Sequence, residues 1–186
     1  MKRFFDLFVL IFFLILLLIP SFLVALAVMV TSKGAVLYWS DRIGQNNKIF
    51  SMPKFRSMRV DTPAVATHLL VNADTYLTPI GSFIRKNSLD ELPQLWSILR
   101  GDMSFVGPRP ALFNQHDLIE LRTQYKVHTL KPGLTGWAQI NGRDELPIPD
   151  KVALDVEYLH AQSLVLDIKI IIQTSLKVFR QEGVSH

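Results

Sequence analysis

The first thirty residues contain an apolar run that limits how this chain can fold. From Phe4 to Val30 every residue is apolar except Asp6 and Ser21, and about 20 such residues are enough to cross a bilayer as one helix. A cleaved signal peptide has a shorter apolar core with a small-residue cleavage site after it. We therefore expect a retained membrane anchor at residues 1–33, followed by one further domain at residues 34–186.

The course of this anchor depends on Pro20, near the middle of the run. Proline removes one backbone hydrogen bond and clashes with the preceding turn, so a kink is expected. Lys2 and Arg3 precede the run, and further basic residues follow it at positions 33, 42, 48, 54, 56 and 59. Basic residues at both ends favour a helix broken at Pro20 that enters and leaves by the cytoplasmic face. A proline-kinked single span fits the same residues equally well.

The other informative stretch runs from Ser88 to Trp96. Apolar residues at three- and four-residue spacing predict one helix face that ends near Gly101: Leu92, Leu95, Trp96 and Leu99. Pro93 belongs in a first turn, which makes Leu89 or Asp90 the expected cap. The partial positive charge of a helix N-terminus is expected to lower the pKa of Asp90 and keep this carboxylate ionised.

Two roles are open for the adjacent acids Asp90 and Glu91. An ionised aspartate can attack phosphorus and form an acyl phosphate, while a glutamate can hold Mg²⁺, which takes few carboxylates and fills its shell with water and phosphate oxygens. Alternatively, Ser88 caps the helix and Glu91 completes a capping box, so that both acids serve only the helix. The spacing alone favours neither role.

Two cations near these acids are candidate phosphate ligands. Arg109 lies between Pro108 and Pro110, so little freedom is lost when its planar guanidinium binds two phosphate oxygens. Its alternative role is a structural pair with a carboxylate. Lys54 can balance phosphate charge as a mobile cation, or it can extend from an apolar surface to the membrane interface.

The remaining patterns predict a mainly α fold with one small β hairpin. Residues 35–39 and 48–52 form two short strands around the turn-rich stretch 44–47. Near the C-terminus, an apolar stripe at helical spacing predicts an amphipathic helix that rests on lipid headgroups or packs on other helices: Leu164, Ile168, Ile171, Ile172, Leu176 and Phe179.

Three motifs, at residues 88–95, 101–110 and 131–143, together resemble the bacterial sugar transferases, the small monotopic polyprenyl-phosphate sugar-1-phosphate transferases. The resemblance covers nearly the whole chain in the same order. It implies a re-entrant helix and interfacial amphipathic helices around a compact catalytic domain on the cytoplasmic face of the bacterial inner membrane. Family members break this helix at a Ser-Pro pair, whereas this chain has Ile19 before Pro20 and Ser21 after it.

The same resemblance implies a reaction. Sugar-1-phosphate passes from a UDP-sugar to a polyprenyl (undecaprenyl) phosphate, giving UMP and a polyprenyl-diphosphate-sugar, by a ping-pong route through a covalent intermediate on Asp90. Glu91 would bind Mg²⁺, and substrate phosphates would contact Lys54, Arg85, Arg109 and Arg143. Asp155 and Asp167 match further family acids that support the metal or orient basic side chains, although Asp167 can instead cap its own helix. Membrane lipids and downstream glycosyltransferases are the other implied partners.

Composition removes several competing classes. The chain has no cysteine, which excludes disulfides and cysteine-based zinc sites, and its five histidines show no close ligand spacing. A net charge of +4 suits an anionic membrane surface or phosphate substrates. Nucleic-acid binding would be indicated by a basic face interleaved with aromatic residues, and the sequence shows none. A non-catalytic membrane scaffold and a membrane-bound phosphate hydrolase remain as alternatives, and the sequence does not identify the sugar.

Overall fold

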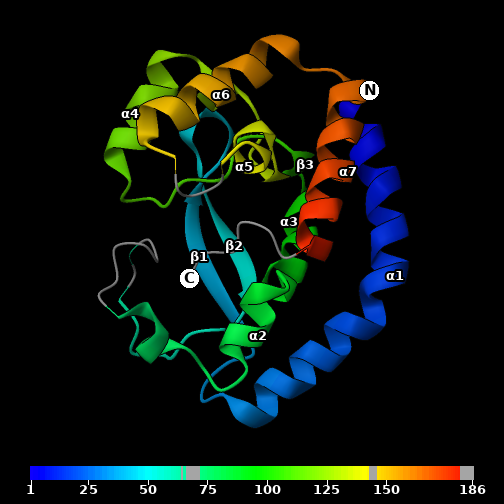
Figure 1. Cartoon of the computed structure of the whole chain (residues 1–186), viewed down its shortest axis with the longest axis vertical. Helices are drawn as coiled ribbons and strands as arrows, with labels where there is room; N and C mark the ends of the chain where they lie inside the picture. Colours follow the sequence, from blue (N-terminus) through cyan, green and yellow to red (C-terminus); the bar gives the residue numbers. More distant parts are fainter. Residues whose placement is uncertain (64, 66–71, 143–145, 181–186) are drawn as a thin grey trace.

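The computed structural model describes residues 1–63, 65, 72–142 and 146–180 (Figure 1). The described chain is mostly helical and has two small two-stranded sheets, which confirms the expected mainly α class with a β hairpin. The α-helices are α1 (Lys2–Thr31), α2 (Gly81–Lys86), α3 (Leu95–Arg100), α4 (His116–Gln124), α5 (Trp137–Ile140), α6 (Ile148–Ala161) and α7 (Leu164–Arg180). Short 3-10 helices are η1 (Gln45–Asn47), η3 (Ala73–Tyr76), η4 (Leu89–Gln94) and η5 (Val127–Thr129).

Helix α1 contains Pro20 but is not interrupted there. Figure 1 shows it turning near its middle, so that its second half runs in another direction from its first. The break expected at Pro20 is thus a bend within one continuous helix, because losing a single hydrogen bond does not unwind a long apolar helix whose neighbouring bonds remain. Within the described residues, α1 is the one helix long and apolar enough to cross a membrane.

The expected hairpin is present. Strands β1 (Leu37–Ile43) and β2 (Ile49–Phe55) pair antiparallel, with Tyr38 opposite Lys54 and Ser40 opposite Met52. Met52 and Ser40 are buried, so this face of the hairpin turns toward the protein interior.

A second sheet was not expected from the sequence. Strands β3 (Ser104–Val106) and β4 (Gly133–Thr135) pair in parallel, and three-residue strands leave no alternation to recognise. A Cβ on Gly133 would lie 2.1 Å from the backbone nitrogen of Gly107, so only glycine allows this approach. The pairing fixes the chain just before the Pro108–Pro110 loop.

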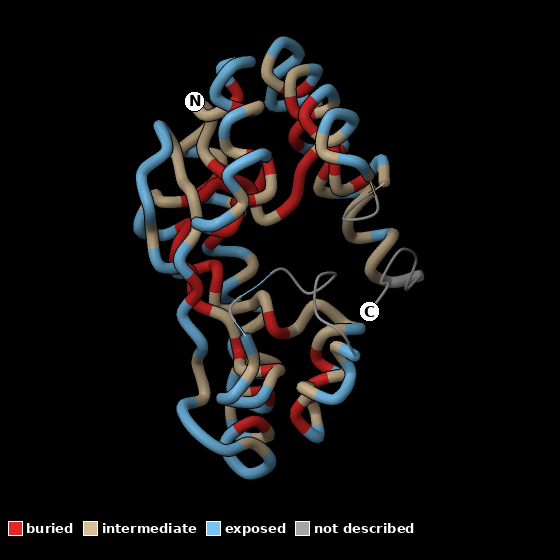
Figure 2. Tube along the Cα trace, turned by 90° about the vertical axis from the view of Figure 1, so that its left-hand side faces the viewer, coloured by how far each residue is buried: buried red, intermediate tan, exposed pale blue. Residues whose placement is uncertain are grey.

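Helix α1 contributes to two of the apolar clusters that form the core. Leu10 packs with Ile98, Phe105 and Ile170 in one cluster. Further along α1, a second cluster joins it to β2, α2 and η4 through Val24, Val28, Phe55, Ile84, Leu89 and Leu92. Figure 2 shows buried segments turned toward one another inside the molecule, with exposed segments along its outside. The apolar helix α1 is therefore also packed against the rest of the chain.

Polar contacts fix the beginning of α1 to the body. Lys2 Nζ donates to Asp167 Oδ2 at 2.5 Å, and the Arg3 guanidinium donates to two backbone carbonyls at the end of α3. Asp6 is buried and accepts hydrogen bonds from Ser104 Oγ at 2.9 Å and from the Phe105 N–H at 3.2 Å. A buried carboxylate needs such donors, so this turn of α1 is held in place by specific polar partners.

The C-terminal helix divides its apolar residues between the core and the surface. Ile170 is fully buried and Ile171 packs against the main cluster, whereas Ile168, Ile172 and Leu176 are exposed. Figure 1 draws α7 alongside the first half of α1, whose outward residues are also apolar and exposed. The expected stripe therefore lies outside the core for most of its length.

Candidate active site

Asp90 and Glu91 lie in the first turn of the 3-10 helix η4, which leads directly into α3. Helix α3 ends before Gly101, whose φ of 92° is left-handed, as expected from the sequence. Ser88 is the residue before η4, but it is itself left-handed, with a φ of 54°, and its side chain makes no capping hydrogen bond. The capping box is therefore wrong, and neither Leu89 nor Asp90 is the cap.

The apolar side of η4 determines where the acids point. Leu89 and Leu92, which flank the pair, pack against the cluster that contains Phe55 and Val28. Because these leucines occupy the side of η4 that faces α1, the carboxylates turn toward the last residues of β2. The acid pair is thus anchored directly over the second half of the apolar helix.

Glu91 forms the centre of an ion-pair cluster. Its Oε1 accepts a hydrogen bond from Lys54 Nζ at 2.8 Å and another from Arg109 Nη2 at 3.2 Å. The two cations reach it from different elements, Lys54 from β2 and Arg109 from the Pro108–Pro110 loop. Burial acts to raise the pKa of Glu91, but the charges and hydrogen bonds of Lys54 and Arg109 outweigh it and hold this pKa below its ordinary value.

Asp90 is more deeply placed and less directly paired. It is 7% exposed, and its Oδ2 lies 3.8 Å from Lys54 Nζ. Burial raises the pKa of Asp90 above its ordinary value, although Lys54, Arg85 and Arg109 oppose the shift. The expected lowering by a helix N-terminus was wrong in direction, since removal from water outweighs the few N–H groups of a short 3-10 helix.

Three of the four predicted phosphate-binding cations therefore act on the acid pair. Lys54 and Arg109 contact Glu91, and the charge of Arg85 is felt by Asp90. The sequence left open a structural role for Arg109 as the partner of a carboxylate. Arg109 does pair with a carboxylate, but that carboxylate belongs to Glu91, one of the two candidate catalytic acids. Arg143 lies outside the described residues.

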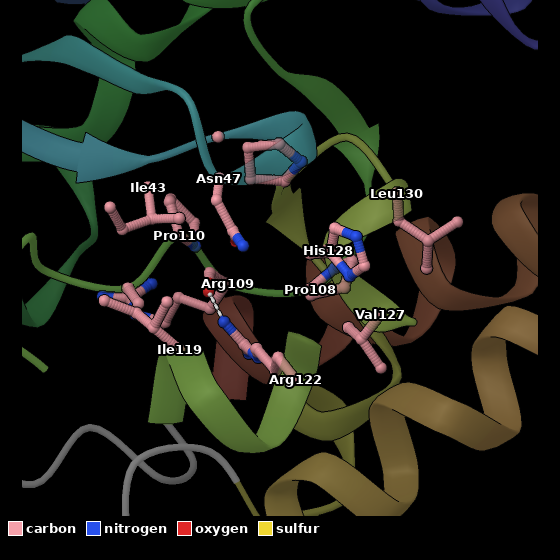
Figure 3. A pocket seen from close by; sticks show the side chains of 13 residues that line it. Ile43, Asn47, Pro108, Arg109, Pro110, Ile119, Arg122, Val127, His128 and Leu130 are labelled. Carbon is pink, nitrogen blue, oxygen red and sulfur yellow. Dashed lines mark hydrogen bonds between the residues drawn. The ribbon is translucent and has the colours of Figure 1, made fainter. Parts of the chain in front are cut away.

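The backbone of the loop that carries Arg109 is fixed by Arg122, a residue that no sequence pattern had indicated. Arg122 donates to the carbonyl of Arg109 at 2.7 Å, and its other nitrogens donate to Asp155 Oδ2 at 2.9 and 2.7 Å. Arg109 and Arg122 line a small pocket together with Asn47 and His128, as Figure 3 shows. Neither Asp90 nor Glu91 lines it. Nothing in the polar sequence of α4 distinguishes Arg122 from a surface residue.

The two predicted supporting acids both orient basic side chains. Asp155 holds Arg122, and Asp167 accepts from Lys2 and from the Tyr158 hydroxyl, the latter at 2.6 Å. Asp167 makes these contacts with α1 and α6, so it does more than cap its own helix. Two roles were predicted for these acids, supporting the metal or orienting basic side chains. Their contacts correspond to the second role.

The chemistry of the acid pair fits one divalent cation. No group of three or more His, Asp or Glu suited to a metal occurs in the described part of the chain, but Mg²⁺ needs only one or two carboxylates when phosphate and water supply its other ligands. Both cation contacts of Glu91 go to Oε1, so they do not themselves engage Oε2. The donor set at Glu91, with Asp90 beside it, is therefore compatible with Mg²⁺.

Comparison with known proteins identifies close relatives. The model of the family described as bacterial sugar transferase matches residues 1–181. The chain is 45% identical to the undecaprenyl-phosphate glucose phosphotransferase of Komagataeibacter xylinus, over 93% of this chain and 35% of that protein. It is 44% identical to the UDP-glucose:undecaprenyl-phosphate glucose-1-phosphate transferase of Escherichia coli K12, over 89% of this chain and 38% of that protein.

A shorter relative matches along most of its length. The chain is 40% identical to the uncharacterized sugar transferase EpsL of Bacillus subtilis 168, over 99% of this chain and 90% of that protein. By contrast, the chain spans little more than a third of the glucose-phosphate transferases.

Opposite pKa shifts predict opposite effects of neutralising the two acids at pH 7. Asp90→Asn should raise the unfolding temperature, because folding currently requires a disfavoured charged carboxylate, and this gain should vanish as the pH falls toward 3.8. Glu91→Gln should destabilise the protein by about 1–3 kcal/mol, since charge-assisted hydrogen bonds are lost. That loss should shrink as the pH falls from 4.5 through the lowered folded pKa.

Tryptophan fluorescence during heating in detergent micelles measures both effects, from about pH 7, where ordinary carboxylates are ionised, down to about pH 3, below both ordinary carboxyl pKa values. Glu120→Gln neutralises an exposed acid on α4 and should leave the unfolding temperature unchanged. Unfolding temperatures that move in the same direction for Asp90→Asn and Glu91→Gln at pH 7 would contradict the assigned electrostatics.

Proposed function

Because the chain belongs to the bacterial sugar transferase family, we propose that it transfers sugar-1-phosphate from a UDP-sugar to undecaprenyl phosphate or a related polyprenyl phosphate. The products are UMP and a polyprenyl-diphosphate-sugar, the first intermediate of a membrane-associated glycan. The observation that carries the proposal is the Asp90–Glu91 pair, buried at Asp90 and partly buried at Glu91, which is acted on by Lys54, Arg85 and Arg109. The names of the relatives support the substrate classes.

Asp90 is the proposed nucleophile. Its carboxylate oxygen attacks the sugar-proximal phosphorus of the UDP-sugar, the bond from that phosphorus to the bridging oxygen breaks, and UMP leaves. The product is a sugar-phosphoryl-aspartate. Its weaker pairing supports this role, since Lys54 lies 3.8 Å from Asp90 but bonds directly to Glu91 at 2.8 Å. A carboxylate with fewer fixed donors has oxygen lone pairs available to phosphorus.

The surrounding cations stabilise the charge that develops on phosphorus. Lys54 and Arg109 are already positioned on Glu91, so little rearrangement is needed when phosphate oxygens arrive. The side chain of Arg109 is 40% exposed, and the fork of its guanidinium can reach toward a substrate. Its backbone stays fixed through Arg122 and Asp155.

Glu91 is the proposed Mg²⁺ ligand, with Asp90 beside it. When bound there, Mg²⁺ would lower the negative charge of the substrate diphosphate, which repels an attacking carboxylate. Glu91 would hold the ion through Oε2, since Oε1 accepts from Lys54 and Arg109.

We further propose that α1 is re-entrant and that the site faces the cytoplasm. The two ends of a spanning helix are separated by about 30 Å of hydrocarbon, and a polar body could not contact both. Here Lys2 and Asp6 contact the body at one end of α1, and Val24 and Val28 pack on it at the other. The exposed apolar residues of α7 would then rest on the same membrane surface.

Cysteine accessibility tests this topology, because the chain has no native cysteine. Single cysteines replace the exposed residues Phe4, Lys33 and, as a marker of the body, Glu120. A membrane-impermeant maleimide should label all three only from the cytoplasmic side, using inverted and right-side-out vesicles. Ile15→Cys, in the exposed middle of α1, should be protected in both. Labelling of Phe4→Cys from the face opposite Glu120→Cys would show that α1 spans.

Isotope exchange tests the covalent route. A ping-pong enzyme with Mg²⁺ and no lipid should incorporate labelled UMP into UDP-sugar, because the first half-reaction runs in both directions. Asp90→Asn should reduce the exchange by at least about a hundredfold, as expected when a nucleophile is removed. The exposed control Asp61→Asn should exchange normally. Chelation of Mg²⁺ should stop the exchange.

The other outcomes separate the competing classes. UMP formed with lipid, but no exchange without it, would indicate direct transfer and exclude the aspartyl intermediate. Free sugar phosphate formed without lipid would indicate a hydrolase, and the absence of any nucleotide-dependent product would indicate a scaffold.

A further inference from the structure

Arg56 lies on the same face of the hairpin as Lys54. The two residues are two positions apart, and the pairing continues beyond β2 because the Arg56 N–H donates to the carbonyl of Val36 at 2.9 Å. Residues two apart on a strand point to one face and are separated by about 6.6 Å along it. Tyr38, directly opposite Lys54, shares that face. Arg56 and the ring of Tyr38 therefore lie on the same face of the hairpin as Lys54.

The Arg56 side chain is fixed without an acid. Its Nε donates to the carbonyl of Ala35 at 2.7 Å, and its guanidinium lies 6.0 Å from the centre of the Tyr38 ring. A left-handed turn at Gly34, with a φ of 94°, brings this part of the chain to Arg56. Among the residues that the structure describes, no carboxylate forms an ion pair with Arg56. A fixed guanidinium with no counter-charge is suited to binding an anion.

Arg56 and Arg109 approach Lys54 from opposite ends of the hairpin. The loop that carries Arg109 contacts the turn end, where Arg42 donates to the carbonyl of Pro110 at 3.2 Å. Arg56 lies at the open end, where the chain has just left α1. An anion held by Arg56 would therefore reach the reacting centre from the side of α1, and one held by Arg109 from the other side.

The α1 side is the one that meets the membrane in the proposed topology. Gly34 and Ala35 follow the last turn of α1, and Phe55, the residue before Arg56, packs against Val24 and Val28. Arg56 is therefore placed where the helix leaves the lipid, at the depth of headgroup phosphates. A phosphate attached to a membrane-embedded chain can approach there without leaving the bilayer surface.

We infer that Arg56, positioned by Tyr38, binds the phosphate of the lipid acceptor in a subsite separate from the nucleotide phosphates; this inference rests on the proposed function. An ionised oxygen of the bound lipid phosphate attacks phosphorus in the sugar-phosphoryl-aspartate. A new P–O bond forms, the bond between phosphorus and the Asp90 oxygen breaks, and Asp90 leaves as a carboxylate. No proton is gained or lost. Arg56 orients the attacking phosphate, and the Tyr38 ring keeps the guanidinium in place.

Comparing the two half-reactions tests the subsite. Arg56→Gln should keep the lipid-independent UMP exchange within about twofold of wild type, whereas the KM for polyprenyl phosphate should rise by about tenfold or more, as expected when charge-assisted hydrogen bonds are lost. Tyr38→Leu should raise the same KM by a smaller factor, and Tyr38→Phe, which keeps the ring, should match wild type. Arg59→Gln is the matched control, since Arg59 is exposed and paired with Asp61, and it should change neither half-reaction.

If the unfolding temperature of Arg56→Gln shows that this variant folds poorly, Arg56→Lys is measured in its place. Lysine keeps the charge but not the fork, so exchange should be intact and the KM for lipid should be intermediate. Exchange that falls in step with lipid transfer in a folded Arg56 variant would place the cation on the nucleotide and overturn the inference. An unchanged KM for lipid would overturn it as well. Absence of exchange in the wild type would instead defeat the proposed function.

Discussion

Taking two adjacent carboxylates out of water requires cations, and the arrangement of this fold follows from that requirement. Asp90 and Glu91 are neighbours on one short 3-10 helix, yet the charges that act on them come from β2, α2 and the Pro108–Pro110 loop. Glu91 Oε1 accepts from Lys54 and Arg109, which favour the charged form of Glu91, while Asp90 Oδ2 lies 3.8 Å from Lys54 Nζ and burial raises the pKa of Asp90. This asymmetry is the basis for proposing Glu91 as the metal ligand and Asp90 as the nucleophile.

Helix α1 packs directly against the segment that carries that electrostatic cluster. Its second half forms the apolar floor on which Leu89 and Leu92 rest, and its first turn is fixed through Lys2 and Asp6. A shift of α1 relative to the body would therefore move the floor beneath the acids. In the proposed topology, the same packing would set both the depth of α1 in lipid and the depth of Asp90, where a lipid phosphate could reach it.

The sequence predicted what depends on local patterns. The hairpin, the end of α3 at Gly101 and the long apolar helix were expected from local sequence patterns, and the family resemblance implied that Lys54, Arg85 and Arg109 act at one site with the acids. Long-range contacts were not predictable. Arg122 supports Arg109 through Asp155, the β3–β4 pairing has only three residues per strand, and the raised pKa of Asp90 results from burial by distant segments. Even within a motif, residue type did not predict the local contacts. Serine favours a helix cap, but Ser88 has a left-handed backbone and its side chain makes no capping hydrogen bond.

The proposed mechanism depends on Asp90, which would carry the sugar phosphate between donor and acceptor. The most direct measurement is peptide mass spectrometry after the protein is incubated with Mg²⁺ and UDP-sugar without lipid and then quenched. One sugar-phosphate is expected on the peptide that contains Asp90, and it should be lost when polyprenyl phosphate is added before quenching. UMP produced with Asp90 unmodified, or the modification found on another residue, would contradict it.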